Sequence, residues 1–211
     1  MLNRVELSQY IATKLCHDLA GSLGAISNGL DFITSDNEEM KERAIELIKT
    51  SSEQSVDRLV FFRQTYGIAK HDGEANLDEL KKVASDYLKA SKVTLDFHEK
   101  YFHIPDIFIS ANLGKLILCL IHHAYLNLIH GGEIVVVVEK NNKTKILISA
   151  RGPSPKLDEE KDAILTKKSQ TKELSTKNCI SYFAESFADF LKVNITTHTS
   201  EKDKIDYEII F

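Results

Sequence analysis

The sequence predicts an α+β protein in which a long helical hairpin precedes an α/β sandwich with helices on one face of a mixed sheet. Three observations predict this fold. Residues 5–69 contain no proline and repeat apolar residues at helical spacing. Residues 76–211 alternate helix-like segments with short strand-like runs. The segment HDGEA, His71–Ala75, lies between them and is the expected boundary of domains at 1–70 and 76–211.

The hairpin is expected to turn at Thr34–Asn37, and Glu38 and Glu39 suit the positive end of its second helix. Each helix would be about 40 Å long at about 1.5 Å per residue. A lone hairpin of this length cannot cover an apolar stripe on both helices, so we expect a homodimer whose two hairpins form a four-helix bundle. The stripe residues are Ile11, Leu15, Leu19, Leu23, Ile26, Leu30 and Ile33 in the first helix, and Ile45, Ile48, Val56, Leu59, Phe62 and Tyr66 in the second.

The second half is expected to form helices and strands in a mixed order. A short helix capped by Asn76 begins it, and Gly131-Gly132 ends a strongly apolar helix. The expected helices are 76–90, 112–129 and 174–191. The expected strands are 92–97, 108–110, 134–138 and 145–149 around a turn at Asn141-Asn142, and 193–198 paired with 205–211.

The composition argues against several classes of function. The 211 residues are 43% hydrophobic and 27% charged, as in a globular protein. A net charge of −4 argues against nucleic acid as a main partner and gives no polybasic patch for a membrane. We expect no membrane-spanning helix and no signal peptide, hence a cytoplasmic protein. The three isolated cysteines suggest a reducing compartment and no metal cluster.

The segment CHDLAGSLGAISNGL, residues 16–30, places a histidine beside an aspartate and then three glycines within the first expected helix. At about 100° per residue, His17 falls on the side opposite the apolar stripe, so its imidazole is expected to be exposed. A glycine costs about 1 kcal/mol relative to alanine in a helix interior. We expect these glycines to keep the surface around His17 low, so that a second protein can approach; alternatively, they break the helix or let the helices pack closely. The small neighbours of His17 are Thr13, Ala20, Gly21 and Gly24.

An exposed imidazole is largely uncharged and nucleophilic at neutral pH. A neighbouring carboxylate can accept a hydrogen bond from Nδ1–H, which fixes the tautomer and leaves Nε2 free to attack. Asp18 is expected to do this for His17. Phosphoryl transfer depends mostly on positioning, so a nucleophilic histidine on a rigid helix suits it. The alternative is a solvated polar pair without function, which is what a lone His-Asp pair usually is.

Three short motifs, His17-Asp18-Leu19, Gly24-Ala25-Ile26 and Asn28-Gly29-Leu30, resemble the N-terminal segment of alphaproteobacterial histidine phosphotransferases of the ChpT type. The hairpin is also similar to the dimerisation and phosphoacceptor domain of sensor histidine kinases. The resemblance implies a degenerate kinase-like ATPase domain after the hairpin. It also implies that His17 takes a phosphoryl group from the aspartate of one receiver domain and gives it to that of another.

The same resemblance implies the partners. The donor would be the receiver domain of a hybrid histidine kinase, and the acceptors a CtrA-type response regulator and a single-domain receiver. The chain would bind no cofactor or metal, because Mg²⁺ belongs to the receiver's own site, and its second domain would be a second docking surface. Kinases that also dephosphorylate their partner carry Thr or Asn four residues after the histidine. Gly21 stands there, so no such phosphatase activity is expected.

The second half departs from the pattern of active kinases. Where kinases carry an asparagine that helps hold Mg²⁺, this chain has His122-His123-Ala124, and the aspartate that binds adenine is replaced by Ala150. Losing one charged hydrogen bond costs about 1.5–3 kcal/mol, or about 10- to 150-fold in affinity. Ser169–Cys179 contains no glycine-rich lid. We therefore expect no useful ATP binding. Adjacent helical residues point about 100° apart, so the histidine pair is expected to be buried in the helix rather than to bind a metal.

Two residues of the second helix are expected near His17, which would lie level with Ser55 if the chain turns near Ser35. Arg58 and Phe61 fall away from the apolar stripe of that helix. Arg58 would steady the phosphoryl charge or the partner. Phe61 would be an exposed anchor for a receiver domain; the alternative is that it packs against the second domain.

Two further functions stay open. One is an ATP-dependent sensor-type histidine kinase whose nucleotide motifs align differently. The other is a dimeric adaptor that binds signalling proteins without being phosphorylated. ATP binding separates the kinase from the phosphotransferase, and His17→Ala separates both from the adaptor, which should tolerate the substitution.

Overall fold

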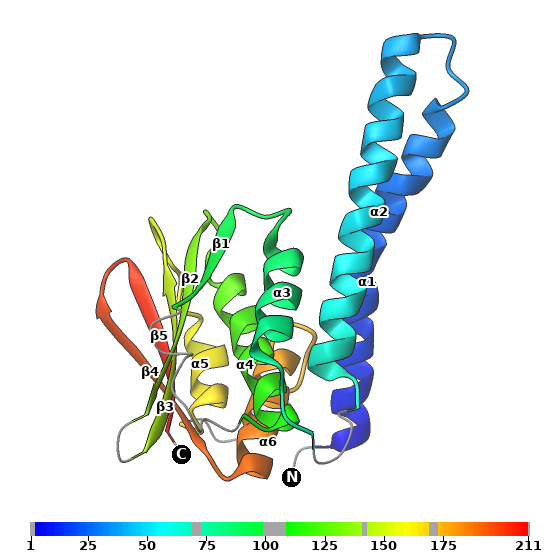
Figure 1. Ribbon diagram of the computed structural model, residues 1–211. Helices are drawn as coiled ribbons and strands as arrows, with labels where there is room; N and C mark the ends of the chain where they lie inside the picture. Colours follow the sequence, from blue (N-terminus) through cyan, green and yellow to red (C-terminus); the bar gives the residue numbers. More distant parts are fainter. Residues whose placement is uncertain (1–2, 69–72, 99–108, 141–142, 169–172, 211) are drawn as a thin grey trace.

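The computed structural model describes residues 3–68, 73–98, 109–140, 143–168 and 173–210. A hairpin of two long helices stands beside an α/β domain and extends well beyond it (Figure 1). Helix α1 spans Arg4–Phe32 and helix α2 spans Glu38–Tyr66, as the sequence predicted. Among the described residues, no helix is both long and apolar enough to cross a bilayer.

Both hairpin helices begin at a capping asparagine. The Asn3 side chain accepts hydrogen bonds at the start of α1, and the Asn37 side chain accepts one from Met40 N at the start of α2. Two contacts fix how the helices lie against each other. Ser55 Oγ donates to Ser22 Oγ at 2.9 Å, and α2 passes so close to Gly29 that an added Cβ would lie 2.6 Å from Ile48 Cγ1.

The α/β domain is a five-stranded mixed sheet with helices on one face (Figure 1). The strand order is β1-β2-β3-β5-β4, in which β1 and β2 are parallel and the other pairs antiparallel. This confirms the predicted layout. The helices are α3 (Leu77–Leu88), α4 (Ala111–Leu126), α5 (Glu159–Leu165) and α6 (Cys179–Leu191). The strands are β1 (Val93–Phe97), β2 (Gly132–Lys140), β3 (Thr144–Arg151), β4 (Asn194–Glu201) and β5 (Lys204–Ile210).

Three local predictions were wrong or incomplete. Residues 109–110 do not form a strand of the sheet; Ser110 makes only an isolated bridge to Glu74. Helix α6 begins at Cys179 rather than at residue 174, because the Asn178 side chain accepts from Ser175 N and donates to Glu173 O, which holds this segment in a turn. Helix α5 was not predicted, since its seven residues are too short and too acidic to show a clear stripe.

Parts of some predictions fall outside the described residues. They include Phe108, the turn at Asn141-Asn142, the first residues of the expected linker, and the first residues of Ser169–Cys179, the segment without a glycine-rich lid. The described part of the linker is attached to the α/β domain: Ala75 N donates to Ile109 O, and Ala111 N donates to Gly73 O, both at 2.8 Å. Residues 73–75 of the linker are therefore held against the segment that leads into α4.

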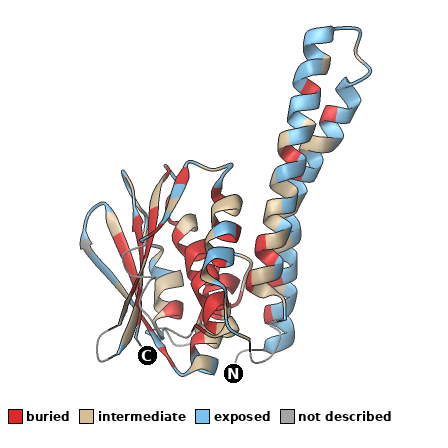
Figure 2. Ribbon diagram, viewed as in Figure 1, coloured by how far each residue is buried: buried red, intermediate tan, exposed pale blue. Residues whose placement is uncertain are grey.

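One hydrophobic core extends from the sheet into the base of the hairpin (Figure 2). Its centre is α4, which is buried on all sides from Leu113 to Ala124. The hairpin contributes Leu7, Ile11, Phe61 and Phe62 to the same cluster. Lys115, only 7% exposed, donates from Nζ to Gln64 O at 2.9 Å and also to Gly67 O. Its ammonium thereby binds carbonyls at the C-terminal end of α2, where positive charge is favourable.

Candidate functional site

His17 lies on α1 with its side chain 85% exposed. This confirms the position expected from the helical wheel, on the side away from the apolar stripe. Thr13, Gly21 and Gly24 are exposed as well, and a Cβ added to either glycine would meet nothing within 4 Å. The surface around the imidazole is therefore low and open, as predicted for these three residues.

Gly29, the third glycine of the segment, is needed for a different reason from Gly21 and Gly24. A Cβ on Gly29 would lie 2.6 Å from Ile48 Cγ1 and 3.2 Å from Ala44 O, so the close packing of α1 and α2 requires a glycine there. For Gly29 the alternative explanation, helix packing, is the correct one.

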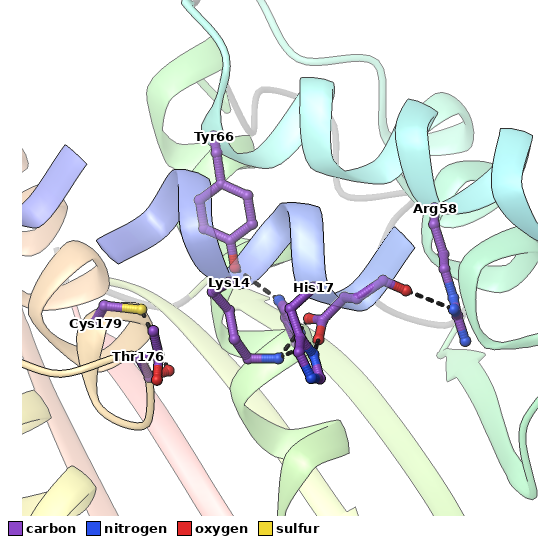
Figure 3. A network of polar contacts seen from close by, with 8 residues as sticks. Lys14, His17, Arg58, Tyr66, Thr176 and Cys179 are labelled. Atoms are coloured by element: carbon purple, nitrogen blue, oxygen red, sulfur yellow. Dashed lines mark hydrogen bonds and ion pairs between the residues drawn. The ribbon is translucent and has the colours of Figure 1, made fainter. Parts of the chain in front are cut away.

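Asp18 lies beside the imidazole but is bound mainly by another residue. Its Oδ1 is 3.5 Å from His17 Nδ1, a long contact. Lys14, one turn earlier on α1, donates from Nζ to the same Oδ1 at 2.6 Å and also contacts Oδ2 (Figure 3). Both side chains of this ion pair are about four-fifths buried. Lys14 was not among the predicted site residues, although a Lys-Asp pair four residues apart is a recognisable helical ion pair.

Arg58 reaches the site from α2, as expected, but through the backbone. Its Nη1 donates to Asp18 O at 2.7 Å (Figure 3). The guanidinium thus braces α1 against α2 at the level of the site. The two contacts between the helices show which residues are level: Ser55 with Ser22, and Arg58 with Asp18. His17 was expected to be level with Ser55. It lies instead about one helical turn closer to the C-terminal end of α2, just beyond Arg58.

Phe61 is not an exposed anchor; that prediction was wrong. Its side chain is fully buried and stacks on Tyr87 of α3, with ring centroids 4.0 Å apart. The α/β domain covers this face of α2, and a helical wheel drawn for the hairpin alone cannot show that. The alternative, that Phe61 packs against the second domain, is confirmed.

The histidine pair of α4 is buried, as expected. His122 Nδ1 is 2.7 Å from the hydroxyl of Tyr66, and burial lowers the pKa of His122 to about 3. The ring of His123 packs edge-on to Tyr207, and burial lowers its pKa to about 4. Among the described residues, no group of three His, Cys, Asp or Glu side chains could hold a metal ion.

The kinase resemblance places ligands of Mg²⁺ and adenine at His123 and Ala150. Here His123 is enclosed by the core, and Ala150 is buried with no polar side-chain atom. These residues do not fit a bound nucleotide and its metal ion, because they offer neither a carboxylate nor an accessible side-chain oxygen at the two positions.

The fold and the site together define a class of protein: a long helical hairpin with an exposed histidine, joined to an α/β domain that has helices on one face of a five-stranded mixed sheet. Residues 77–203 match the family model described as the histidine phosphotransferase C-terminal domain. The chain belongs to the histidine phosphotransferase family.

Individual relatives agree with this assignment. The chain is 26% identical to the protein phosphotransferase ChpT of Brucella abortus (strain 2308) over 153 residues, which cover 72% of this chain and 70% of that protein. A solved structure of a bacterial phosphotransferase superposes with a TM-score of 0.82 at 20% identity, over 99% of this chain and 98% of that one.

Proposed function

We propose that His17 is the phosphoacceptor of this chain and that the protein shuttles phosphoryl groups between receiver-domain aspartates in a phosphorelay. The observation that carries the proposal is the exposed imidazole on a braced helix, surrounded by small side chains. A receiver can bring its aspartyl phosphate close to Nε2, because the imidazole is 85% exposed and the space above Gly21 and Gly24 is open.

Asp18 and Arg58 support the reaction in different ways. The Asp18 carboxylate accepts from Nδ1–H of His17, which keeps Nε2 unprotonated and directed outward. Arg58 holds the backbone of Asp18 in place, so that the attacking atom has one position, and positioning is most of what phosphoryl transfer needs. Thr13, Gly21 and Gly24 form the surface that the receiver contacts. Mg²⁺ enters with the receiver, and this chain binds neither the metal nor ATP.

The chain acts as a homodimer through the distal part of the hairpin. Five aliphatic side chains there are more than half exposed in a single chain, a pattern that the two-helix stripe predicts for a four-helix bundle. The dimer leaves His17 free, because at about 100° per residue the imidazole lies about 120° around α1 from Leu23 and about 140° from Leu30. The five residues are Leu23, Leu30, Ile45, Val56 and Leu59.

The partners are receiver domains in the cytoplasm. The donor is the receiver of a hybrid histidine kinase, and the acceptors are a CtrA-type response regulator and a single-domain receiver. The family assignment and the open face around His17 support receivers as a class. The particular receivers are inferred from the resemblance to phosphotransferases of the ChpT type.

Intact-mass analysis of the full chain tests this function. Wild type and His17→Ala are incubated with Mg²⁺ and either ATP alone or a receiver domain phosphorylated with acetyl phosphate. We expect one phosphoryl group on wild type from a receiver, and none from ATP or on His17→Ala. Labelling from ATP alone would make the protein a kinase. Absence of labelling from every receiver tried would leave the adaptor as the better account.

A further inference from the structure

Lys14 and His17 share one carboxylate oxygen. Asp18 Oδ1 accepts from Lys14 Nζ at 2.6 Å and lies 3.5 Å from His17 Nδ1. Residues three apart are neighbours on a helix surface, so the ammonium and the imidazole occupy one side of α1. Figure 3 shows Lys14 and His17 projecting from α1 next to each other. The negative charge of a phosphoryl group on His17 would therefore be attracted by the Lys14 ammonium, which is already beside the imidazole.

The other titratable groups that face Lys14 and Asp18 cannot supply a mobile positive charge. Within the described part of the chain they are Arg58 of α2, Tyr87 of α3, His122 of α4 and Cys179 of α6. His122 stays neutral near pH 7, and burial raises the pKa of Tyr87 and that of Cys179, the latter to about 11. Arg58 is bound to a backbone carbonyl. Lys14 is the cation of this group whose present partner is a side chain and can be exchanged.

We propose that Lys14 is a positioning residue for phosphoryl transfer: it binds Asp18 before the transfer and a phosphoryl oxygen after it. This inference rests on the proposed role of His17. In the transfer, Nε2 of His17 forms a bond to phosphorus as the bond between phosphorus and the receiver's aspartate oxygen breaks. The electron pair leaves with that carboxylate, and the imidazole keeps its Nδ1 proton and becomes cationic.

Phosphorylation of His17 favours a shift of the Lys14 ammonium from the Asp18 carboxylate to the phosphoryl group. A phosphoryl group carries about −1.5 to −2 charges and three acceptor oxygens, so it attracts an ammonium more strongly than one carboxylate does. Once Lys14 has left, Asp18 can accept fully from the Nδ1–H of the cationic ring. Each anion then faces one cation, and the phosphohistidine is held in place at two points.

Labelling by potassium phosphoramidate tests the proposal without a receiver. This reagent gives its phosphoryl group to an imidazole and releases ammonia, and intact mass measures the second-order rate constant. We expect Lys14→Met to lower that rate constant about tenfold, as the loss of one charge-assisted contact in the transition state would. Lys14→Arg should restore most of the rate. Lys82→Met is the matched control, because it removes a Lys-Asp pair of the same spacing from α3.

A double-mutant cycle separates direct contact from an effect through Asp18. If Lys14 acts on the phosphoryl group, Lys14→Met lowers the rate about tenfold in the Asp18→Asn background too. If Lys14 only holds Asp18, its effect disappears in that background, and the proposal is overturned. An unchanged rate in Lys14→Met alone would also overturn it.

His17→Ala keeps this test distinct from that of the proposed function. Labelling of His17→Ala at the wild-type rate, or no labelling of wild type at all, would remove His17 as the acceptor and the role of Lys14 with it. Labelling of wild type but not of His17→Ala, at a rate that all Lys14 variants share with wild type, would overturn only the role of Lys14. Thermal unfolding of each variant checks that the hairpin is intact.

Discussion

The base and the distal end of the hairpin carry similar helical patterns of apolar residues but pack differently. At the base, Phe61 and Phe62 are buried against α3 and α4. The distal end is mostly exposed (Figure 2), and aliphatic side chains there such as Leu23 and Ile45 are more than half exposed. The periodicity identifies the face that needs a partner, but the partner differs: the chain's own α/β domain at the base, and a second copy, as we propose, at the distal end.

The base should be the part of the hairpin on which folding depends most. Phe61→Ala removes a fully buried ring that stacks on Tyr87, and should cost about 3–5 kcal/mol of unfolding free energy. Urea denaturation measures this loss. Phe190→Ala is the control, because that ring is 70% exposed and should change stability by less than about 0.5 kcal/mol. Equal effects of the two substitutions would contradict the packing described here.

The distal end should determine association. Ile45→Glu places a charge in the proposed dimer interface, and should raise the dimer dissociation constant by about 100-fold, or about 3 kcal/mol. Sedimentation equilibrium measures it. Asn28→Glu, exposed on the other side of the hairpin, should leave the constant unchanged. A wild-type chain that is monomeric at micromolar concentration would show that nothing covers the distal face.

Acid should weaken the α4 packing that supports the base. His122 and His123 are neutral when folded, with pKa values lowered to about 3 and about 4, but bind protons below about pH 6.5 when unfolded. The unfolded state thus binds more protons, so stability is full above pH 6.5 and falls as the pH falls, by about 2 kcal/mol per histidine at pH 5.

Urea unfolding at pH 7.5 and at pH 5 checks this dependence. His122→Gln should remove about half of the change that the pair causes, whereas His130→Gln, at an exposed position, should leave it as in wild type. A wild-type stability that is flat between these pH values would mean that the two buried histidines are already charged, or that unfolding leaves them enclosed.

The three glycines of α1 provide the smallest and sharpest contrast. Gly29→Ala should cost about 1–2 kcal/mol, because its Cβ would collide with Ile48 and Ala44 of α2. Gly21→Ala and Gly24→Ala should each gain about 0.5–1 kcal/mol, because alanine favours the helix and the added methyl group meets open space. Thermal unfolding compares the three. Slower phosphoryl transfer from a receiver in the two stabilised variants would support the view that the low surface serves the partner.

The sequence could predict the position of His17 because a helical wheel needs only the stripe of its own helix. It could not predict the burial of Phe61, since the element that covers that residue, α3, lies elsewhere in the chain. The apolar stripe gave no sign of Lys14, because the Lys14–Asp18 ion pair consists of polar residues outside that stripe. The departures from the kinase pattern at His123 and Ala150 could be predicted from the sequence, since each is a change of residue type at a motif position. Their burial required the fold.

The buried ammonium of Lys115 has a kinetic consequence. Swinging the hairpin away from α4 would break its bonds to the last carbonyls of α2 and leave a charge without partners in the gap. Such openings of the hairpin are therefore rare events. Access to His17 therefore needs no hinge motion of the hairpin, because the imidazole is exposed while the hairpin stays packed on α4.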